Sequence, residues 1–232
     1  MDALRPRVLL NFAASLDGKI APSPGARNGY VTMSRHAEDH RRMRELRAEA
    51  DAILIGAGNL RADDPDLALP GAEEERRRAT GARPPMRVVI TRRGEGIEPD
   101  CKMFDRAKGG RSFVVHSEGL PAEKRERLAR VTTLVEMGEL AVDMLRMLTW
   151  LAREQGVRVL LCEGGGILAG ELFRARVVDQ LFLTVVPRVL GGSDAPTLAQ
   201  GPSLFPEANV EASLAAVDRV GDELFLRYDF RW

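Results

Sequence analysis

Short apolar runs alternate along this chain with polar stretches of helical character. Apolar runs of this length are typical of buried strands, because a buried helix needs a longer apolar stretch. Alternating apolar and polar positions near the C-terminus are also typical of strands. The predicted strands cover residues 8–14, 51–55, 86–91, 112–117, 131–135, 159–162, 178–186 and 223–230.

Three stretches carry the features of helices. Residues 36–50 are rich in arginine and glutamate, which indicates a helix with a wide solvent-exposed face. Residues 140–154 form an amphipathic pattern that a glycine ends. Leu168, Leu172 and Phe173 recur at helical spacing, so a third helix is expected there.

Two stretches are predicted to be irregular. Residues 59–69 are expected to form a loop, in which Asp63 and Asp64 either brace the backbone or carry function. Residues 71–83 are polar and have no apolar period, so they are predicted to be exposed and mobile.

The order of these elements predicts an α/β fold, because strands and helices alternate as they do around parallel sheets. We expect the early strands to be parallel and the last two to close the sheet as an antiparallel edge pair. No linker and no internal repeat interrupts the pattern. The sequence therefore predicts one domain over residues 1–232, a mostly parallel central sheet flanked by helices.

Charge and cysteine content narrow the class of protein. The chain has 34 Lys and Arg against 34 Asp and Glu residues, which argues against an electrostatic nucleic-acid binder. It has no apolar run of about 18 residues for a membrane span, and residues 1–7 lack a signal-peptide core. Cys101 and Cys162 give neither a disulfide framework nor a metal-ligand spacing. We expect a cytoplasmic protein without metal, nucleic-acid or membrane partners.

The strand at 159–162 is followed by Glu163, by the triple glycine Gly164, Gly165 and Gly166, and then by a predicted helix. Glycines let backbone pass close to a ligand, and a helix start offers free N–H groups to phosphate. The alternative is a tight strand-to-helix connection without a ligand. Glu163 likewise is either a functional carboxylate or a residue that caps the helix start.

Ligands of open α/β sheets bind beyond the carboxyl ends of the strands. Two glycine turns and a helix start at these ends suit a ligand with several phosphates, and Arg92 and Arg93 can hold a 2′-phosphate bidentately. The alternative is that both arginines are ordinary turn residues. The glycine spacing differs from that of the Rossmann fingerprint. The strand-end residues are Ser15, Asp17, Lys19, Gly56, Gly58, Asn59, Thr91, Arg92, Arg93, His116, Ser117 and Glu163.

His36–Ala37–Glu38 has the form of a zinc-deaminase signature, in which the histidine binds the metal and the glutamate moves protons. That site also needs two closely spaced cysteines downstream. The chain has none at this spacing. An ordinary helix start is therefore expected here.

Five segments, in order, resemble the reductase domain of riboflavin biosynthesis. They are ASLDGKIA (14–21), LRAEADAILIGAG (46–58), RADDPDL (61–67), CEGGG (162–166) and VDQLFLTVVPRVLGG (178–192). This domain forms the C-terminal half of a bifunctional deaminase–reductase and also occurs as a stand-alone pyrimidine reductase. The resemblance covers most of the chain and implies a dihydrofolate reductase-like fold. It also points to a homodimer.

The resemblance implies NADPH as the hydride donor and a 5-amino-6-(5-phosphoribosylamino)uracil-type pyrimidine as the acceptor. The ribosyl group would be reduced to a ribityl chain. Hydride transfer needs two aligned carbons and a proton source, for which Lys19, Asp64 and Glu163 are all candidates. Substrate contacts are implied for Tyr30, Arg47 and Asp64. The strand-end positions and the resemblance together predict the cofactor contacts. These are Gly56, Gly58, Asn59, Thr91, Arg92, Ser117, Gly164, Gly165 and Gly166.

The chain departs from the family pattern at three positions. Asn59 replaces a threonine, and Ala68 and Pro70 stand where the family usually has threonine and arginine. That arginine would help to hold the substrate phosphate. A reductase of another pterin- or pyrimidine-like substrate is therefore an alternative. A non-catalytic nucleotide-binding protein is a second alternative, against which the three retained candidate proton sources argue.

Overall fold

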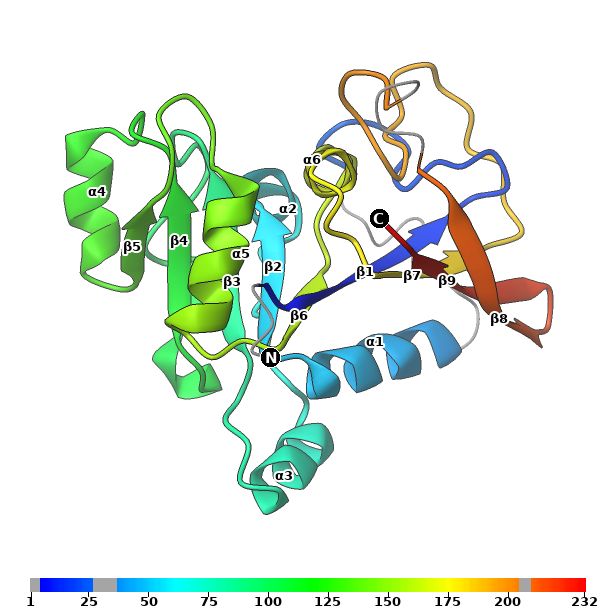
Figure 1. Ribbon diagram of the computed structural model, residues 1–232, viewed down its shortest axis with the longest axis horizontal. Coiled ribbons are helices and arrows are strands. Elements are labelled where there is room, and N and C mark those ends of the chain that lie inside the picture. The colour runs from blue at the N-terminus through cyan, green and yellow to red at the C-terminus, as the bar shows by residue number, and fades with distance from the viewer. Residues whose placement is uncertain (1–4, 27–36, 205–209) are drawn as a thin grey trace. The chain divides into compact units, whose positions relative to one another are not determined.

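The computed structural model describes residues 5–26, 37–204 and 210–232 and has an α/β fold, as the sequence predicts (Figure 1). The chain forms two compact units. The first consists of Met1–Pro6 and Arg44–Leu161, and the second of Arg7–Met43 and Cys162–Trp232. Helix α1 (Glu38–Glu49) begins in the second unit and ends in the first, within the helix predicted at 36–50.

The first unit is built on a parallel sheet with the strand order β5-β4-β3-β2-β6. The pairings of β2 with β3, β3 with β4 and β4 with β5 are all parallel. The prediction of parallel early strands is thus confirmed. The strands are β2 (Ala52–Gly56), β3 (Met86–Thr91), β4 (Ser112–His116), β5 (Thr133–Glu136) and β6 (Val159–Cys162).

The first unit has more helix than the sequence pattern predicts. Its helices are α2 (Ala57–Asp63), α3 (Gly71–Ala79), α4 (Ala122–Ala129) and α5 (Met144–Arg153), with short 3₁₀ turns η2 (Lys102–Phe104) and η3 (Arg106–Lys108). The prediction of a loop from residue 59 onward was wrong up to Asp63, and α4 was not predicted. Helix α5 begins later than expected, because Asp143 caps it by accepting a hydrogen bond from Arg146 N at 2.9 Å.

Helix α3 corrects the prediction that residues 71–83 are irregular. None of its residues is buried, so it has no apolar face for a sequence pattern to reveal. Polar contacts hold it instead. Arg77 donates to the carbonyl oxygen of Ala48 at 2.6 Å and lies 3.5 Å from the Asp51 carboxylate, and Arg78 pairs with Glu74 one turn away.

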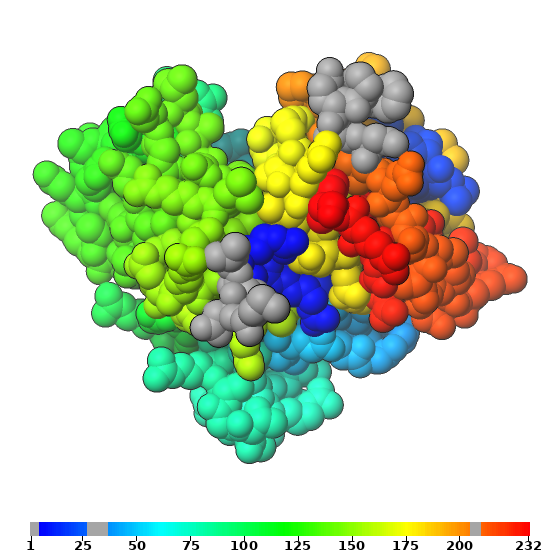
Figure 2. Space-filling view, viewed as in Figure 1, coloured from blue at the N-terminus to red at the C-terminus, as the bar shows by residue number. Residues whose placement is uncertain are grey.

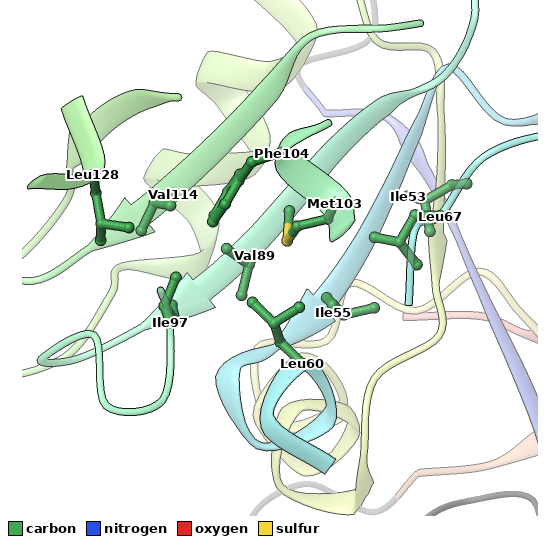
Figure 3. Close-up of a cluster of buried hydrophobic side chains, with 10 residues drawn as sticks. All are labelled: Ile53, Ile55, Leu60, Leu67, Val89, Ile97, Met103, Phe104, Val114 and Leu128. Carbon is green, nitrogen blue, oxygen red and sulfur yellow. The ribbon is translucent and has the colours of Figure 1, made fainter. Parts of the chain in front are cut away.

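A buried apolar cluster lies against one face of this sheet (Figure 3). Strands β2, β3 and β4 contribute to it, and Leu60 joins it from α2. Helix α5 packs elsewhere, since Trp150 meets the ring of Phe113 edge-on at 5.3 Å between ring centroids. The cluster consists of Ile53, Ile55, Leu60, Leu67, Val89, Ile97, Met103, Phe104, Val114 and Leu128.

The second unit has the strand order β1-β7-β9-β8. Strands β1 (Arg7–Ala14) and β7 (Gln180–Val185) are parallel, while β9 (Glu223–Phe230) runs antiparallel to both β7 and β8 (Ala212–Val220). The predicted antiparallel C-terminal edge is confirmed, but β8 was not predicted and is the outer strand. Most of β8 is exposed, which explains its weak apolar signal. It lies at the surface, in orange, in Figure 2.

A buried polar contact anchors the start of α1 within the second unit. The Thr184 hydroxyl is fully buried, donates to Asp39 Oδ1 at 2.5 Å and accepts from Arg42 Nη2 at 2.5 Å. The Arg42 guanidinium also lies 5.0 Å from the centre of the Phe225 ring. Burial lowers the pKa of Arg42, and the nearby Asp39 carboxylate opposes this shift. The pairing with Asp39 offsets part of the cost of burying the charge.

Replacing Leu60 with alanine should destabilise the protein, while the same change at Leu140 should not. Leu60 is 1% exposed and lies in the apolar cluster, whereas Leu140 is 81% exposed. The cavity left by Leu60→Ala is expected to cost about 2–5 kcal/mol of unfolding free energy, against less than about 0.5 kcal/mol for Leu140→Ala. Urea denaturation measures both. Equal midpoints for the two variants would contradict the assigned core.

Candidate functional site

Three predicted cofactor contacts lie at the carboxyl ends of neighbouring strands in the first unit. Gly56 ends β2, Thr91 ends β3 beside His116, and Ser117 follows β4. Both hydroxyls shape the turn after β3, since Thr91 Oγ1 accepts from Gly94 N at 2.8 Å and Ser117 Oγ donates to the Arg92 carbonyl at 2.9 Å. Because both hydroxyls are used in this way, the surface at this edge of the sheet is formed by the turn after β3 and by the backbone groups of Thr91 and Ser117.

Two cations stand on that turn. Arg92 and Arg93 are both exposed, and Arg92 donates through Nε to the carbonyl oxygen of Leu140 at 2.9 Å. Within the described part of the chain, no carboxylate forms an ion pair with either arginine. A guanidinium anchored at Nε keeps its two Nη groups as donors. The pair is thus suited to an anionic ligand group.

Gly56 and Gly58 belong to the start of α2 rather than to an open glycine turn, which corrects the sequence prediction. Gly56 is the N-cap, with φ −89° and ψ 155°, and no side chain caps the helix. A Cβ on Gly58 would meet no atom within 4 Å. The packing of the protein therefore does not require glycine at Gly58. Asn59 follows in the same helix and is partly exposed.

The Asp–Asp–Pro segment contains strained backbone. Asp64 ends α2 in the left-handed conformation at φ 43°, and Leu67 has φ 54° although its side chain is buried. Positive φ is uncommon outside glycine and clusters at functional sites. The Asp64 carboxylate accepts from Lys102 N at 3.0 Å and lies 3.5 Å from Lys102 Nζ. It braces the loop as the alternative interpretation proposed, and 42% of its side chain remains exposed.

Arg47 is brought to the same segment. Its Nη1 donates to the carbonyl oxygen of Ala68 at 3.3 Å, and Ala68 N in turn donates to Asp66 Oδ1 at 3.1 Å. Arg47 thus lies beside the positions where the chain departs from the family pattern. The structure places the Arg47 guanidinium against Ala68, three residues after the Asp–Asp–Pro motif, within the first unit.

In the second unit, Lys19 lies in a turn directly after β1. Ser15 N donates to the Lys19 carbonyl at 2.9 Å, and Lys19 N donates to Ser15 Oγ at 3.0 Å. The ammonium group donates to the carbonyl oxygen of Ala195 at 3.3 Å, and Lys19 forms a β-bridge with Thr197. Both ends of the lysine are therefore held, and its side chain remains partly exposed.

The triple glycine of the second unit has a packing role as well as an open helix start. Helix α6 (Gly166–Arg174) begins after Gly165, and no side chain caps it. A Cβ on Gly166 would lie 2.1 Å from the carbonyl oxygen of Thr197, and one on Gly164 would lie 2.7 Å from Leu168 Cδ2. The uncapped N-terminus suits a phosphate, while Gly166 is also required by close packing.

The residues around this turn differ in reactivity. Glu163 is partly exposed, directly before the glycines. Burial raises the pKa of the Cys162 thiol to about 12, so this cysteine is inert.

Among the described residues, no three His, Cys, Asp or Glu side chains gather as metal ligands. None of the helices in the described ranges is long and apolar enough to cross a membrane.

The predicted site residues fall into two sets. The first unit brings together those that follow β2, β3 and β4, and separately joins Arg47 to the Asp64 segment. The second unit holds Lys19, Glu163 and the triple glycine. Tyr30 and His36 lie outside the described residues. The sequence identifies Asp17 only as a strand-end residue. Ser15 is its one local partner, and its other two partners, Leu190 and Gly191, lie far away in sequence.

Known proteins resemble this chain over nearly its whole length. A reductase of Archaeoglobus fulgidus, named 2,5-diamino-6-ribosylamino-4(3H)-pyrimidinone 5′-phosphate reductase, is 36% identical over 221 residues, which cover 94% of this chain and 95% of the relative. A protein of the same name from Methanothermobacter thermautotrophicus is 31% identical, covering 97% and 98%.

Solved structures share the fold. Acinetobacter baumannii RibD superposes with a TM-score of 0.77 at 19% identity, over 99% of this chain and 59% of that one. Saccharomyces cerevisiae riboflavin biosynthesis reductase Rib7 gives 0.71 at 21% identity, over 100% and 92%. The model of the RibD C-terminal domain family matches residues 6–226, and the chain therefore belongs to this family.

Proposed function

We propose that this protein is an NADPH-dependent reductase of riboflavin biosynthesis that converts the ribosyl group of a phosphoribosylamino-pyrimidine to the ribityl form. The observation that carries the proposal is the match, along nearly the whole of both chains, to the two archaeal reductases. The RibD C-terminal domain match supports the same reaction class. The retained Lys19, Asp64 and Glu163 favour an enzyme over a binding protein.

The proposed acceptor is the 2,5-diamino-pyrimidinone 5′-phosphate for which both archaeal relatives are named. It carries an amino group on the ring where the uracil-type acceptor carries a carbonyl oxygen. The reacting sugar is the same in both, so the residues proposed to act on it do not change. The bifunctional RibD proteins are covered over only about half of their length, as in Escherichia coli RibD at 53%. They are therefore weaker guides to the ring substituent.

Membership of a reductase family implies a nicotinamide cofactor, and the residues present suit one. When bound, the cofactor supplies the hydride. Arg92 and Arg93 would hold a 2′-phosphate, which is why we propose NADPH rather than NADH. Gly164, Gly165 and the uncapped start of α6 would hold the pyrophosphate. Gly56, Gly58, Asn59, Thr91 and Ser117 would supply the remaining contacts.

Lys19, Asp64 and Glu163 are the proposed catalytic residues, and each can move a proton at the acceptor. Asp64 is held by Lys102, which leaves part of its carboxylate accessible. Arg47 would contact the substrate phosphate, and Tyr30 would stack on the pyrimidine. Since Arg47 already binds the Ala68 carbonyl, a substrate without a phosphate remains the second candidate.

We further propose that residues 1–232 form one domain, because the family model spans parts of both compact units. A cytoplasmic location is proposed because both cysteines are free.

A homodimer is also proposed. Leu214, Val217 and Leu224 are 54%, 51% and 38% exposed. Leu214 and Val217 on β8 lie opposite Tyr228 and Leu226 on β9. Side chains alternate along a strand, so Leu214, Val217 and the β9 residue Leu224 share one face of the β8–β9 pair.

The identity of the acceptor separates the two candidate functions. The protein should oxidise NADPH with the 2,5-diamino-pyrimidinone 5′-phosphate, and more slowly with the uracil-type acceptor or with a dephosphorylated acceptor. Absorbance at the NADPH band measures each rate. Comparable turnover of the dephosphorylated compound would favour the second candidate function. NADPH binding without turnover of any of the three acceptors would refute the proposed reaction.

Arg92 and Arg93 are the proposed ligands of the cofactor's 2′-phosphate. Arg92→Ala and Arg93→Ala, alone and together, should raise the KM for NADPH on the order of tenfold or more, because each removes a charged hydrogen-bond donor. The KM for NADH should stay unchanged. Arg130→Ala is the control, since Arg130 is also exposed. Equal changes for NADPH and NADH would show that neither arginine reads the 2′-phosphate.

The exposed apolar face of β8 and β9 is the proposed dimer interface. Light scattering at micromolar concentration should give the mass of a dimer, and Val217→Lys should give a monomer, because it places a charge on the apolar face. Ser213→Lys is the matched control on the same strand. Ser213 lies opposite Asp229, on the other face of the pair, and its variant should remain dimeric. A monomeric wild type would remove the proposal.

A further inference from the structure

Asp17 lies at an exposed turn yet its carboxylate accepts three hydrogen bonds, all within the second unit. Oδ1 accepts from Ser15 Oγ at 2.6 Å and from Leu190 N at 3.1 Å, and Oδ2 accepts from Gly191 N at 2.7 Å. The serine hydroxyl and then the two backbone N–H groups hold the pKa of Asp17 at about 2, below its ordinary value of 3.8. The carboxylate is therefore ionised throughout the neutral range.

The turn does not need this carboxylate for its own geometry. Gly18 adopts φ 76°, which suits a turn, and its N–H donates to the Ser15 carbonyl at 2.9 Å. Two of the three donors to Asp17 instead come from residues 173 and 174 positions later in the sequence. Its carboxylate thus joins the turn to the 188–197 segment.

Lys19 also links the turn after β1 to the 188–197 segment. Its backbone is held by Ser15, whose hydroxyl also donates to Asp17, and its ammonium group donates to the carbonyl oxygen of Ala195. Beside Asp17, Leu16 N donates to the Arg188 carbonyl at 2.7 Å and so also joins the turn to this segment. Displacing the 188–197 segment from the turn would therefore move the partner of Lys19 Nζ.

We propose that Asp17 is a positioning residue for Lys19. Its ionised carboxylate holds the 188–197 segment against the turn, and this fixes the place of the lysine ammonium group. The proposal rests on the proposed function, in which Lys19 acts on the substrate. Asp17 is not a proton donor, because all three hydrogen bonds stabilise its ionised form.

The test compares Asp17→Asn with Asp17→Glu, and uses Asp100→Asn as the matched control. Asparagine keeps the size of the side chain but replaces one acceptor oxygen with an NH₂ donor, so it cannot accept from both Leu190 and Gly191 as aspartate does. Glutamate restores both oxygens. Asp100 is an exposed carboxylate in the first unit, and its variant should behave as the wild type.

Asp17→Asn should lower kcat on the order of ten- to a hundredfold, because a misplacement of about 1 Å costs that much. The KM for NADPH should stay unchanged, and Asp17→Glu should recover part of the rate. In a Lys19→Met background, Asp17→Asn should cause no further loss, since the two residues act as one unit. Multiplicative losses in the double variant would overturn the proposal.

A second readout does not depend on turnover. Competitive acetylation followed by mass spectrometry should show that Lys19 reacts faster in Asp17→Asn than in the wild type, because its ammonium group is released from Ala195. If no acceptor is reduced by the wild type, this measurement still tests the positioning role. Unchanged labelling of Lys19 would overturn the proposal even when the reductase assay succeeds.

Acid unfolding supplies a further check. The pKa of Asp17 is lower in the folded state, so its stabilising effect is present above pH about 4 and lost as the pH falls towards about 2. The difference in stability between wild type and Asp17→Asn should therefore be full at pH 7 and vanish near pH 2. A difference that stays constant across this range would mean that the carboxylate charge is not what holds the segment.

Discussion

Close packing between α6 and the segment at 197–200 is the constraint on which the second unit depends. The Thr197 carbonyl oxygen lies 2.1 Å from the place of a Cβ on Gly166, and the Gln200 carbonyl lies equally close at Gly170. Gln200 N also donates to the Gly166 carbonyl at 2.9 Å. The segment has no regular secondary structure, so contacts of this kind define its path. The same segment reaches Lys19 through Thr197. One packing arrangement therefore sets both the glycine turn and the lysine.

In the first unit, the sheet and its apolar cluster position the candidate ligand-binding residues. Its parallel ladder aligns the ends of β2, β3 and β4, and the apolar cluster packs on one face of these strands. The side chains at those ends then shape the backbone, as Thr91 and Ser117 do around Arg92. A rigid scaffold that ends in short polar turns is the usual way to place ligand-binding groups. The exposed arginine pair stands on one of these turns.

Most of the charged candidates have a structural partner as well as a proposed chemical role. Asp64 holds the η2 segment through Lys102, and Arg47 holds the Ala68 carbonyl. Such contacts suit a reductase, because hydride transfer depends more on alignment than on a strongly shifted acid or base. Side chains fixed by their neighbours hold a substrate in one geometry. The strained backbone at Asp64 and Leu67 belongs to the same arrangement.

By itself the sequence determined the α/β class, the main strands and the family, because apolar runs report burial and ordered motifs report ancestry. It did not reveal α3 or β8, since polar contacts hold the one and solvent covers most of the other. Tertiary structure alone decided that Gly166 is needed for packing whereas Gly58 is not. It also decided the role of Asp17, whose partners are distant in sequence. A sequence motif identifies residues such as Gly166 and Asp17, but only the tertiary structure shows which distant backbone segments contact them.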